Sequence, residues 1–242
     1  MHAEDLLKRQ LEAIADALSI ICSIKSTVDI VMFSPLLAEQ VGRSCAAHAF
    51  NSFQQALFES VIIRLLALWE KPQKTEESLS NSFPAVVSLI SRPEVSEIIH
   101  SSCRARMRDN WRNLGGLSDV ALEKIATDKS ARVANQAMNK LAELINEIRA
   151  QEVCPEKEAL ENFRHKHIAH LIEQTRREVK RGSPIPFPKC EAVDNLLRKS
   201  LRFHSELSSV ILGVQVIWEP WIESCDRNAA FLWKGCKINP VG

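Results

Sequence analysis

Apolar residues in this chain recur every three or four positions, and that spacing constrains the fold more than any other feature. The clearest stripe lies within Leu36–Trp69 and consists of Phe53, Ala56, Leu57, Val61, Leu65 and Leu68. Positions i, i+3, i+4 and i+7 face one side of an α-helix. Comparable stripes occur in Glu4–Ile30, in residues 134–148 and in Val193–Trp218. Because no stretch alternates with the period of two that a half-buried strand requires, the sequence predicts an all-α protein.

Few helix-breaking residues interrupt these stripes. The 242 residues include only seven glycines and ten prolines, which is few for a protein built of strands and turns. Breaks are expected at Ser34-Pro35, around Pro72, at Gly115-Gly116, in the Pro-rich stretch 182–188 and at Pro220, which should end the last long helix. Without a repeat or a low-complexity linker, residues 1–242 are expected to form a single domain, a bundle of about six or seven helices.

Charge and cysteine content narrow the classes of function. Lys and Arg total 31 against 30 for Asp and Glu, which argues against a strongly basic nucleic-acid coat protein and against an acidic tail protein. Seven cysteines without a CxxC pair are typical of reduced thiols in a cytoplasm. No apolar run approaches the ~20 residues that span a bilayer, and no signal-peptide pattern opens the chain. We therefore expect a cytoplasmic protein that has no membrane partner.

One predicted helix, from residue 156 to about residue 180, breaks its own apolar pattern. Its apolar face is defined by Ala159, Leu160, Phe163, Ile168 and Leu171. At about 100° per residue, Arg164 and His167 fall inside that face, while Lys166 and His170 lie on its flank. Polar groups at core positions cost a few kcal/mol each unless they find partners. Because sequences usually break a local rule where function requires it, this segment is the candidate functional site.

Two other interpretations of these polar residues stay open. In a purely structural one, His167 caps a neighbouring helix and Arg164 pairs with a buried acid such as Glu70 or Glu161. In a metal-binding one, His167 and His170 act as ligands three residues apart. Zinc needs a third and a fourth ligand. The sequence has no HExxH motif, and no carboxylate lies at a spacing from these histidines that would suggest a further ligand. Neither a metal nor another cofactor is therefore expected.

The run of residues 162–170, Asn-Phe-Arg-His-Lys-His-Ile-Ala-His, resembles the signature of HEPN domains (higher eukaryotes and prokaryotes nucleotide-binding). That signature is an Arg followed, after four to six residues, by a His, and here five residues separate Arg164 from His170. The form RxKxxAH is similar to that of the AbiU-like branch, which is named for abortive phage infection. A weaker resemblance to the same branch lies earlier in the chain, where Arg64-Leu65 is followed by an acid and a Ser-Leu pair within residues 70–80.

This resemblance spans about residues 36–218 and implies a HEPN-like four-helix core in a protein that dimerises. In active members, two copies of the motif helix form a metal-independent ribonuclease. At the matching positions His170 would be the general acid or base and Arg164 would bind the phosphate and stabilise the transition state. Histidine titrates near neutrality and can transfer the protons that RNA cleavage requires. Arginine can bind two phosphate oxygens at once.

The other candidate residues come from the helical wheel and not from the family. Lys166 and His167 are expected to add phosphate contacts. Arg64 lies on an otherwise apolar stripe, so it either pairs with an acid or lines the motif pocket. Some HEPN toxins are silenced by modification of a Tyr two residues after the motif His. Position 172 is Ile here and the chain has no Tyr, which excludes that mode of silencing at this site.

Two functions of different classes follow. The first is a HEPN-type endoribonuclease, toxin-like or acting in phage defence, which cleaves RNA as a homodimer and has an antitoxin or regulatory protein as a further partner. The second is a non-catalytic HEPN-like helical module that binds a nucleotide, RNA or a protein. An open site in which Arg164 and His170 of two chains meet would favour the enzyme. Side chains sealed within one chain and paired to carboxylates would favour the module.

Overall fold

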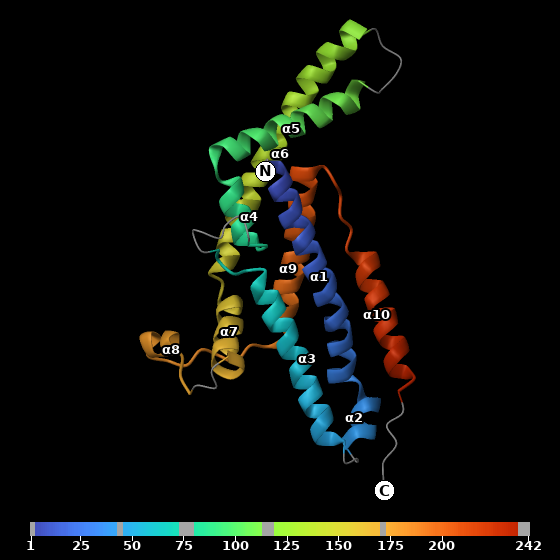
Figure 1. Cartoon of the computed structure of the whole chain (residues 1–242), viewed down its shortest axis with the longest axis vertical. Coiled ribbons are helices and arrows are strands. Elements are labelled where there is room, and N and C mark those ends of the chain that lie inside the picture. The colour runs from blue at the N-terminus through green and yellow to red at the C-terminus, as the bar shows by residue number, and fades with distance from the viewer. Residues whose placement is uncertain (1–2, 43–45, 73–79, 113–118, 170–172, 237–242) are drawn as a thin grey trace. The chain divides into compact units, whose positions relative to one another are not determined.

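The computed structural model describes residues 3–42, 46–72, 80–112, 119–169 and 173–236. These residues form ten α-helices and one π-helical segment, and they contain no strand (Figure 1). The all-α helical class predicted from the apolar periodicity is therefore confirmed. The break predicted at Gly115-Gly116 lies outside the described residues.

The described helices are, in chain order, α1 (Ala3–Phe33), α2 (Pro35–Gly42), α3 (Ala47–Ala67), α4 (Phe83–Ile90), α5 (Pro93–Arg112), α6 (Asp119–Glu152), α7 (Pro155–Phe163), the π-helical segment η1 (Arg164–Ala169), α8 (Arg176–Arg181), α9 (Cys190–Leu212) and α10 (Glu219–Lys234). They outnumber the six or seven expected because several predicted helices are divided. The apolar stretch Leu36–Trp69 is divided between α2 and α3, for example, and the segment predicted as one helix over 156–180 contains three elements.

The last long helix also differs from its prediction. It does not continue to Trp218, since α9 ends at Leu212 and Gly213 adopts a left-handed backbone with φ 69°. Glycine takes this conformation without the steric cost that a Cβ atom brings, and it commonly ends helices. Pro220 does not end a helix but stands in the first turn of α10, where its missing N–H costs nothing.

The chain divides into two compact units. Unit 1 comprises residues 1–15, 69–154 and 199–216, and unit 2 comprises residues 16–68, 155–198 and 217–242. Helices α1 and α9 each contribute residues to both units. The expectation of a single domain over 1–242 concerns folding and function and stays a prediction.

Unit 1 is built on the long pair α5 and α6, which pack against each other, and on a cluster of three aromatic rings (Figure 1). The ring of Trp69 lies 5.0 Å from that of Phe83 and 6.0 Å from that of Phe203, and all three side chains are buried. The indole N–H of Trp69 donates a hydrogen bond to Ser200 Oγ at 3.0 Å, so the polar atom of this buried ring is satisfied. Ser82 caps α4 by accepting a hydrogen bond from a backbone N–H of the first turn.

Unit 2 holds the segment that carries the sequence motif. Its helix α3 packs against both α7 and η1. In the apolar stripe predicted for α3, the second half is buried, including Val61 and Leu65, whereas Phe53 and Ala56 of the first half are exposed. Helices α1 and α10 are joined by a hydrogen bond of 2.6 Å from Ser26 Oγ to a carboxylate oxygen of Asp226. Helix α3 thus contributes buried apolar residues to unit 2 and packs against the two elements that carry the motif.

The lengths and compositions of the helices were compared with those needed to cross a bilayer. Taken singly, none of the described helices is both long enough and apolar enough. The bent pair of α1 and α2, whose axes differ by 63°, meets the same criteria of length and composition only when the two helices are counted together.

Candidate functional site

The segment predicted as one helix over residues 156–180 is divided, and that prediction is wrong. Helix α7 ends at Phe163, η1 continues to Ala169, and α8 begins only at Arg176. The second boundary has a local cause, because Thr175 caps α8 in a capping box. Its hydroxyl accepts a hydrogen bond from the backbone N–H of Glu178 at 3.3 Å, and the Glu178 carboxylate accepts one from the backbone N–H of Thr175 at 2.9 Å. The pattern Thr-x-x-Glu is legible in the sequence and marks a helix start.

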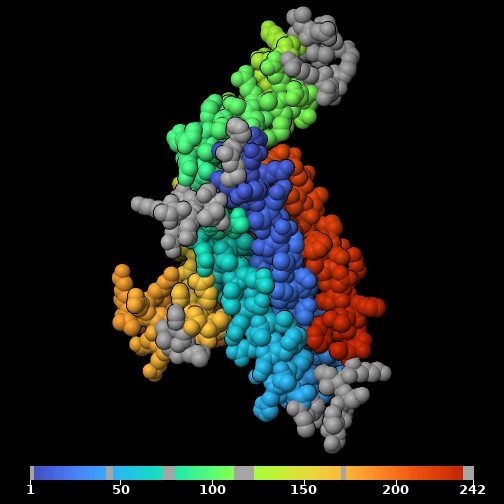
Figure 2. All heavy atoms as spheres, viewed as in Figure 1, coloured from blue at the N-terminus to red at the C-terminus, as the bar shows by residue number. Residues whose placement is uncertain are grey.

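The π-helical turn changes which way the motif residues face. A π-helix has more residues per turn than an α-helix, so a wheel drawn at 100° per residue fails beyond Phe163. None of the six side chains of η1 is buried. His167 is exposed, so its predicted place inside an apolar face is wrong, and Arg164 is only half-buried. In the space-filling view, atoms of α7 and of α8 are visible at the surface (Figure 2).

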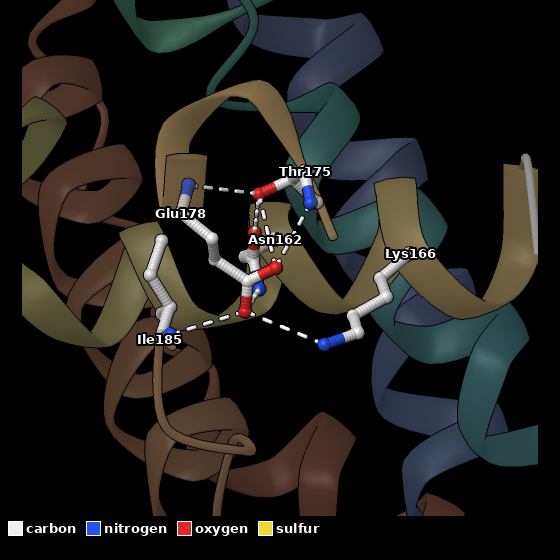
Figure 3. A network of polar contacts seen from close by, with 5 residues as sticks. All are labelled: Asn162, Lys166, Thr175, Glu178 and Ile185. Atoms are coloured by element: carbon white, nitrogen blue, oxygen red, sulfur yellow. Dashed lines mark hydrogen bonds and ion pairs between the residues drawn. The ribbon is translucent and has the colours of Figure 1, made fainter. Parts of the chain in front are cut away.

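Glu178 connects the elements of this site (Figure 3). It is only 3% exposed, and its carboxylate accepts hydrogen bonds from the backbone N–H groups of Thr175 at 2.9 Å and Ile185 at 3.1 Å. The side-chain amide of Asn162 donates a third at 3.3 Å, and the ammonium of Lys166 forms an ion pair at 3.4 Å. One buried carboxylate therefore holds the end of α7, η1, the start of α8 and the loop before α9.

These contacts explain the acidity of Glu178. The two backbone hydrogen bonds, from Thr175 and Ile185, lower the pKa of its carboxyl most, burial opposes them, and Asn162 and Lys166 add to the lowering. The resulting pKa is about 2, against 4.5 for an unperturbed Glu. Hydrogen bonds to a carboxylate stabilise its charged form. Glu178 is thus ionised at neutral pH and remains a fixed negative charge behind Lys166.

A second set of ion pairs holds α8 against α7. Arg177 contacts a carboxylate oxygen of Glu161 at 2.5 Å, and Arg181 contacts Glu158 at 3.5 Å. Lys157 reaches the other oxygen of Glu161 at 2.5 Å. Partial burial opposes ionisation of Glu161, but hydrogen bonds from Lys157 and Arg177 outweigh it and lower the pKa of this carboxyl. Much of the positive charge on α8 is therefore already paired within unit 2.

An aromatic cluster lies beside the network of Glu178. The imidazole of His167 lies 5.1 Å from the ring of Phe163 and 5.8 Å from that of Phe187. A small cavity of about 150 Å³ opens among these three rings, Lys166 and the Pro-rich loop. Phe187 also lines a larger cavity, of about 430 Å³, on which Glu158 borders. Phe187 thus lines both cavities, as do three other residues of the Pro-rich loop.

The structure brings two of the predicted site residues together, while the others lie elsewhere or outside the described residues. Lys166 and His167 both line the small cavity, so the structure brings these two together. Arg164 stands at the first position of η1 and has a polar partner. Arg64 is exposed on α3. His170 lies outside the described residues, as do residues 73–79 of the weaker sequence resemblance, and the roles of all five residues stay predictions.

The sequence reasoning missed Asn162, Thr175, Glu178 and Phe187. The capping box would have revealed Thr175 and Glu178, because it is a local pattern. Asn162 and Phe187 have no such signal, since their roles depend on the loop before α9 folding back onto α7. Within the described residues, no three His, Cys, Asp or Glu side chains are grouped to hold a metal ion.

A larger cavity, of about 710 Å³, belongs to unit 1, whereas the motif belongs to unit 2. Its charged lining consists of Glu4, Asp5, Lys8, Glu12, Arg106 and Asp109. Four carboxylates against two cations repel phosphate, so this cavity does not suit the RNA backbone that the sequence motif points to.

Comparison with known proteins places the chain in one family. The family model HEPN_AbiU2, described as AbiU2, matches residues 3–230. No curated protein and no solved structure matches the chain. The matched region runs from α1 into α10, and so extends beyond the core of about 36–218 over which the sequence motifs resemble a HEPN domain. The chain belongs to the AbiU2 family of HEPN domains and is an abortive-infection module of HEPN type.

Proposed function

We propose that this HEPN module is a metal-independent endoribonuclease, toxin-like or acting in phage defence, whose site is shared between two copies of the chain. The observation that carries the proposal is that residues 164–169 of the motif reach the surface, where His167 and Ala169 are exposed and the other four are partly exposed. None of the side chains from Arg164 to Ala169 is buried. A row of Arg, His and Lys side chains at the surface is open to a polyanion, and π-helical turns are frequent at functional sites.

In this proposal His170 and Arg164 carry the chemistry. A histidine base removes the proton from the 2′-hydroxyl of RNA, whose oxygen attacks the adjacent phosphorus. The bond to the 5′-oxygen breaks, and a histidine acid supplies a proton to that leaving oxygen. Arg164 binds the phosphate oxygens while negative charge accumulates on them. Two copies of the motif supply both proton-transfer groups, and the products are a 2′,3′-cyclic phosphate and a free 5′-hydroxyl.

The second candidate is a non-catalytic module that binds a nucleotide, RNA or a protein. One observation favours it, namely the ion pair between Lys166 and the buried carboxylate of Glu178. A lysine paired at 3.4 Å with a fixed anion has less positive charge to offer a phosphate.

Cleavage of RNA without metal tests the first proposal. Purified protein is incubated with mixed cellular RNA in EDTA, beside His170→Ala and beside His100→Ala, a control histidine on α5 in unit 1. We expect wild type and His100→Ala to produce 2′,3′-cyclic phosphate ends and His170→Ala to lose at least about 100-fold in rate, the usual share of a general acid or base.

The outcomes separate the two candidates. Equal cleavage by wild type and His170→Ala would remove His170 from the mechanism. A folded wild type that binds RNA but does not cleave it would favour the non-catalytic module. Circular dichroism of each variant shows that loss of activity is not loss of fold, and size measurement by sedimentation tests the homodimer.

A further inference from the structure

Phe187 is an exposed aromatic side chain that the fold holds in a fixed place. It is 64% exposed, although the two loop residues Ile185 and Pro188 on either side of it are buried. Its ring meets the ring of Phe163 edge to face, with centroids 4.8 Å apart and planes inclined at 77°. The loop is anchored as well, because the backbone N–H of Ile185 donates to the Glu178 carboxylate. An apolar ring is thus held in contact with solvent at the edge of the small cavity.

The cavity beside this ring is small, and most of the residues that line it are aromatic residues or prolines. Its volume of about 150 Å³ is half of the ~300 Å³ at which pockets for drug-sized ligands begin. It therefore accepts a single planar group rather than a whole nucleotide. Phe163, His167 and Phe187 supply aromatic walls, and the polar part of the lining is Asn162 and Lys166, which both also contact Glu178.

We propose that the ring of Phe187, beside His167, forms a stacking site for one unpaired base of a single-stranded RNA. The inference rests on the proposed function, because it takes RNA as the ligand of this surface. Every nucleobase has a π-face that can stack on an aromatic side chain, and unpaired bases are the part of RNA that proteins bind in this way. The site is three residues from His170 in the chain, so the stacked base belongs to a nucleotide near the bond to be cleaved.

The charges around the cavity favour this ligand and indicate over which surface the RNA strand passes. Lys166 borders the cavity and is 24% exposed, whereas its partner Glu178 does not line the cavity and is nearly fully buried. The larger cavity that Phe187 also lines presents Glu156, Glu158 and Glu191 against two cations. Phosphates are repelled there. The strand should therefore pass over η1, with stacking rather than phosphate contacts supplying most of the affinity at this subsite.

Binding of an RNA that cannot be cleaved tests the stacking site. The probe is a short single-stranded oligonucleotide with 2′-O-methyl groups and one 2-aminopurine base, whose fluorescence falls when the base stacks. The variants are Phe187→Ala and Phe187→Trp, and the matched control is Val179→Ala, since Val179 is an apolar residue of α8 that is 65% exposed. Loss of one base–aromatic stack should weaken binding about 5- to 100-fold.

We expect Phe187→Ala to bind the oligonucleotide that much more weakly and to lose the fluorescence change. Phe187→Trp should keep both because indole also has a π-face, and Val179→Ala should bind as wild type does. The slope of log Kd against log salt should be the same in Phe187→Ala and wild type, since no phosphate contact is removed. Unchanged binding by Phe187→Ala would overturn the proposal.

Two further outcomes separate this inference from the proposed nuclease and from a competing role of the ring. If wild type binds the oligonucleotide through Phe187 but cleaves no RNA, the stacking site stands and the nuclease fails. If wild type cleaves RNA and Phe187→Ala cleaves and binds equally well, the nuclease stands and the stacking site fails. If Phe187→Ala changes the oligomeric state in sedimentation without changing affinity per binding site, the ring contacts a second copy of the chain and not a base. A wild type that does not bind the oligonucleotide would overturn the stacking site.

Discussion

At the scale of single residues, the carboxylate of Glu178 determines how the candidate site is held. It is a buried anion with three N–H donors and one ammonium around it, so no lone pair is left to an apolar environment. Its strongest partners are backbone N–H groups, which cannot move away without unfolding the loop or α8. The residue therefore acts as a positioning group for the segment from Asn162 to Ile185 rather than as a catalytic group.

Replacing Glu178 by Gln should destabilise the protein in a pH-dependent way. The pKa of this carboxyl is about 2 in the folded state and 4.5 when unperturbed, so its charge adds stability above pH 4.5 and that stability fades as the pH falls towards 2. We expect Glu178→Gln to lower Tm by several degrees at pH 6, and we expect the gap from wild type to narrow at pH 3. Melting curves recorded by circular dichroism at pH 6, 5, 4 and 3 measure this difference in Tm.

A suitable control is Glu223→Gln, because Glu223 is 72% exposed and forms only a surface ion pair of 4.0 Å with Arg227. Surface pairs of this kind contribute little, so its Tm should stay close to that of wild type. If Glu178→Gln lowered Tm equally at pH 6 and pH 3, the charge of the carboxylate would not be what holds the site.

At the scale of helices and turns, the sequence predicts what depends on periodicity and misses what depends on a local change of helix type. The break at Ser34-Pro35 and the buried half of α3 were predictable, because prolines and apolar stripes act within a few residues. The π-helical turn was not, because an α-helical wheel assumes the very spacing that changes at Arg164. The pairing of Glu178 with the N–H of Ile185 needs the Pro-rich loop to fold back, which no local pattern encodes.

Two glycines at helix ends make a matched pair for a second prediction. Gly182 after α8 and Gly213 after α9 both adopt left-handed backbones, with φ 70° and 69°. Alanine in this conformation costs about 1–2 kcal/mol at either position. A Cβ atom at Gly182 would meet nothing within 4 Å, whereas one at Gly213 would lie 2.9 Å from Nε of Arg106. Arg106 cannot easily yield, because its guanidinium donates to the carbonyl of Val210 at 3.1 Å.

We therefore expect Gly213→Ala to reduce the free energy of unfolding by about 1 kcal/mol more than Gly182→Ala does, since strain and overpacking add. Urea denaturation of the two variants and wild type under one set of conditions measures the difference. Equal losses would mean that Arg106 moves aside at no cost. A smaller loss for Gly213→Ala would contradict the close contact altogether.

At the scale of the whole molecule, the AbiU2 family match covers residues of both compact units, although the sequence motif lies in unit 2 alone. The family model therefore includes unit 1, whose stability can depend on groups that have no part in the proposed RNA chemistry. Its buried His204 is such a group. It is 2% exposed, and Nε2 lies 3.1 Å from the carbonyl oxygen of Leu11.

Burial lowers the pKa of His204, while the hydrogen bond to the Leu11 carbonyl partly opposes that effect. A folded-state pKa below the unfolded value of 6.5 means that the unfolded chain binds the proton more readily. Stability is then full above pH 6.5 and is lost as the pH falls below it, by at most about 1.4 kcal/mol per pH unit for one proton. This window lies well above the one set by Glu178, so the two groups can be told apart in a single pH series.

His204→Gln should reduce the loss of stability below pH 6.5, because an amide keeps a donor for the Leu11 carbonyl but does not titrate. The urea midpoint of wild type should fall as the pH is lowered from 7 to 6 and 5, and that of His204→Gln should fall less. The control is His100→Gln, since His100 is a histidine bonded to Asn135 on the surface of unit 1, and its midpoint should fall as in wild type. If unit 1 and unit 2 unfold in one transition, the whole transition shifts with His204, even when it is followed by a signal from unit 2. If they unfold separately, only the signal from unit 1 shifts. If the urea midpoint of His204→Gln fell with pH as steeply as that of wild type, the acid sensitivity between pH 7 and 5 would belong to a different group.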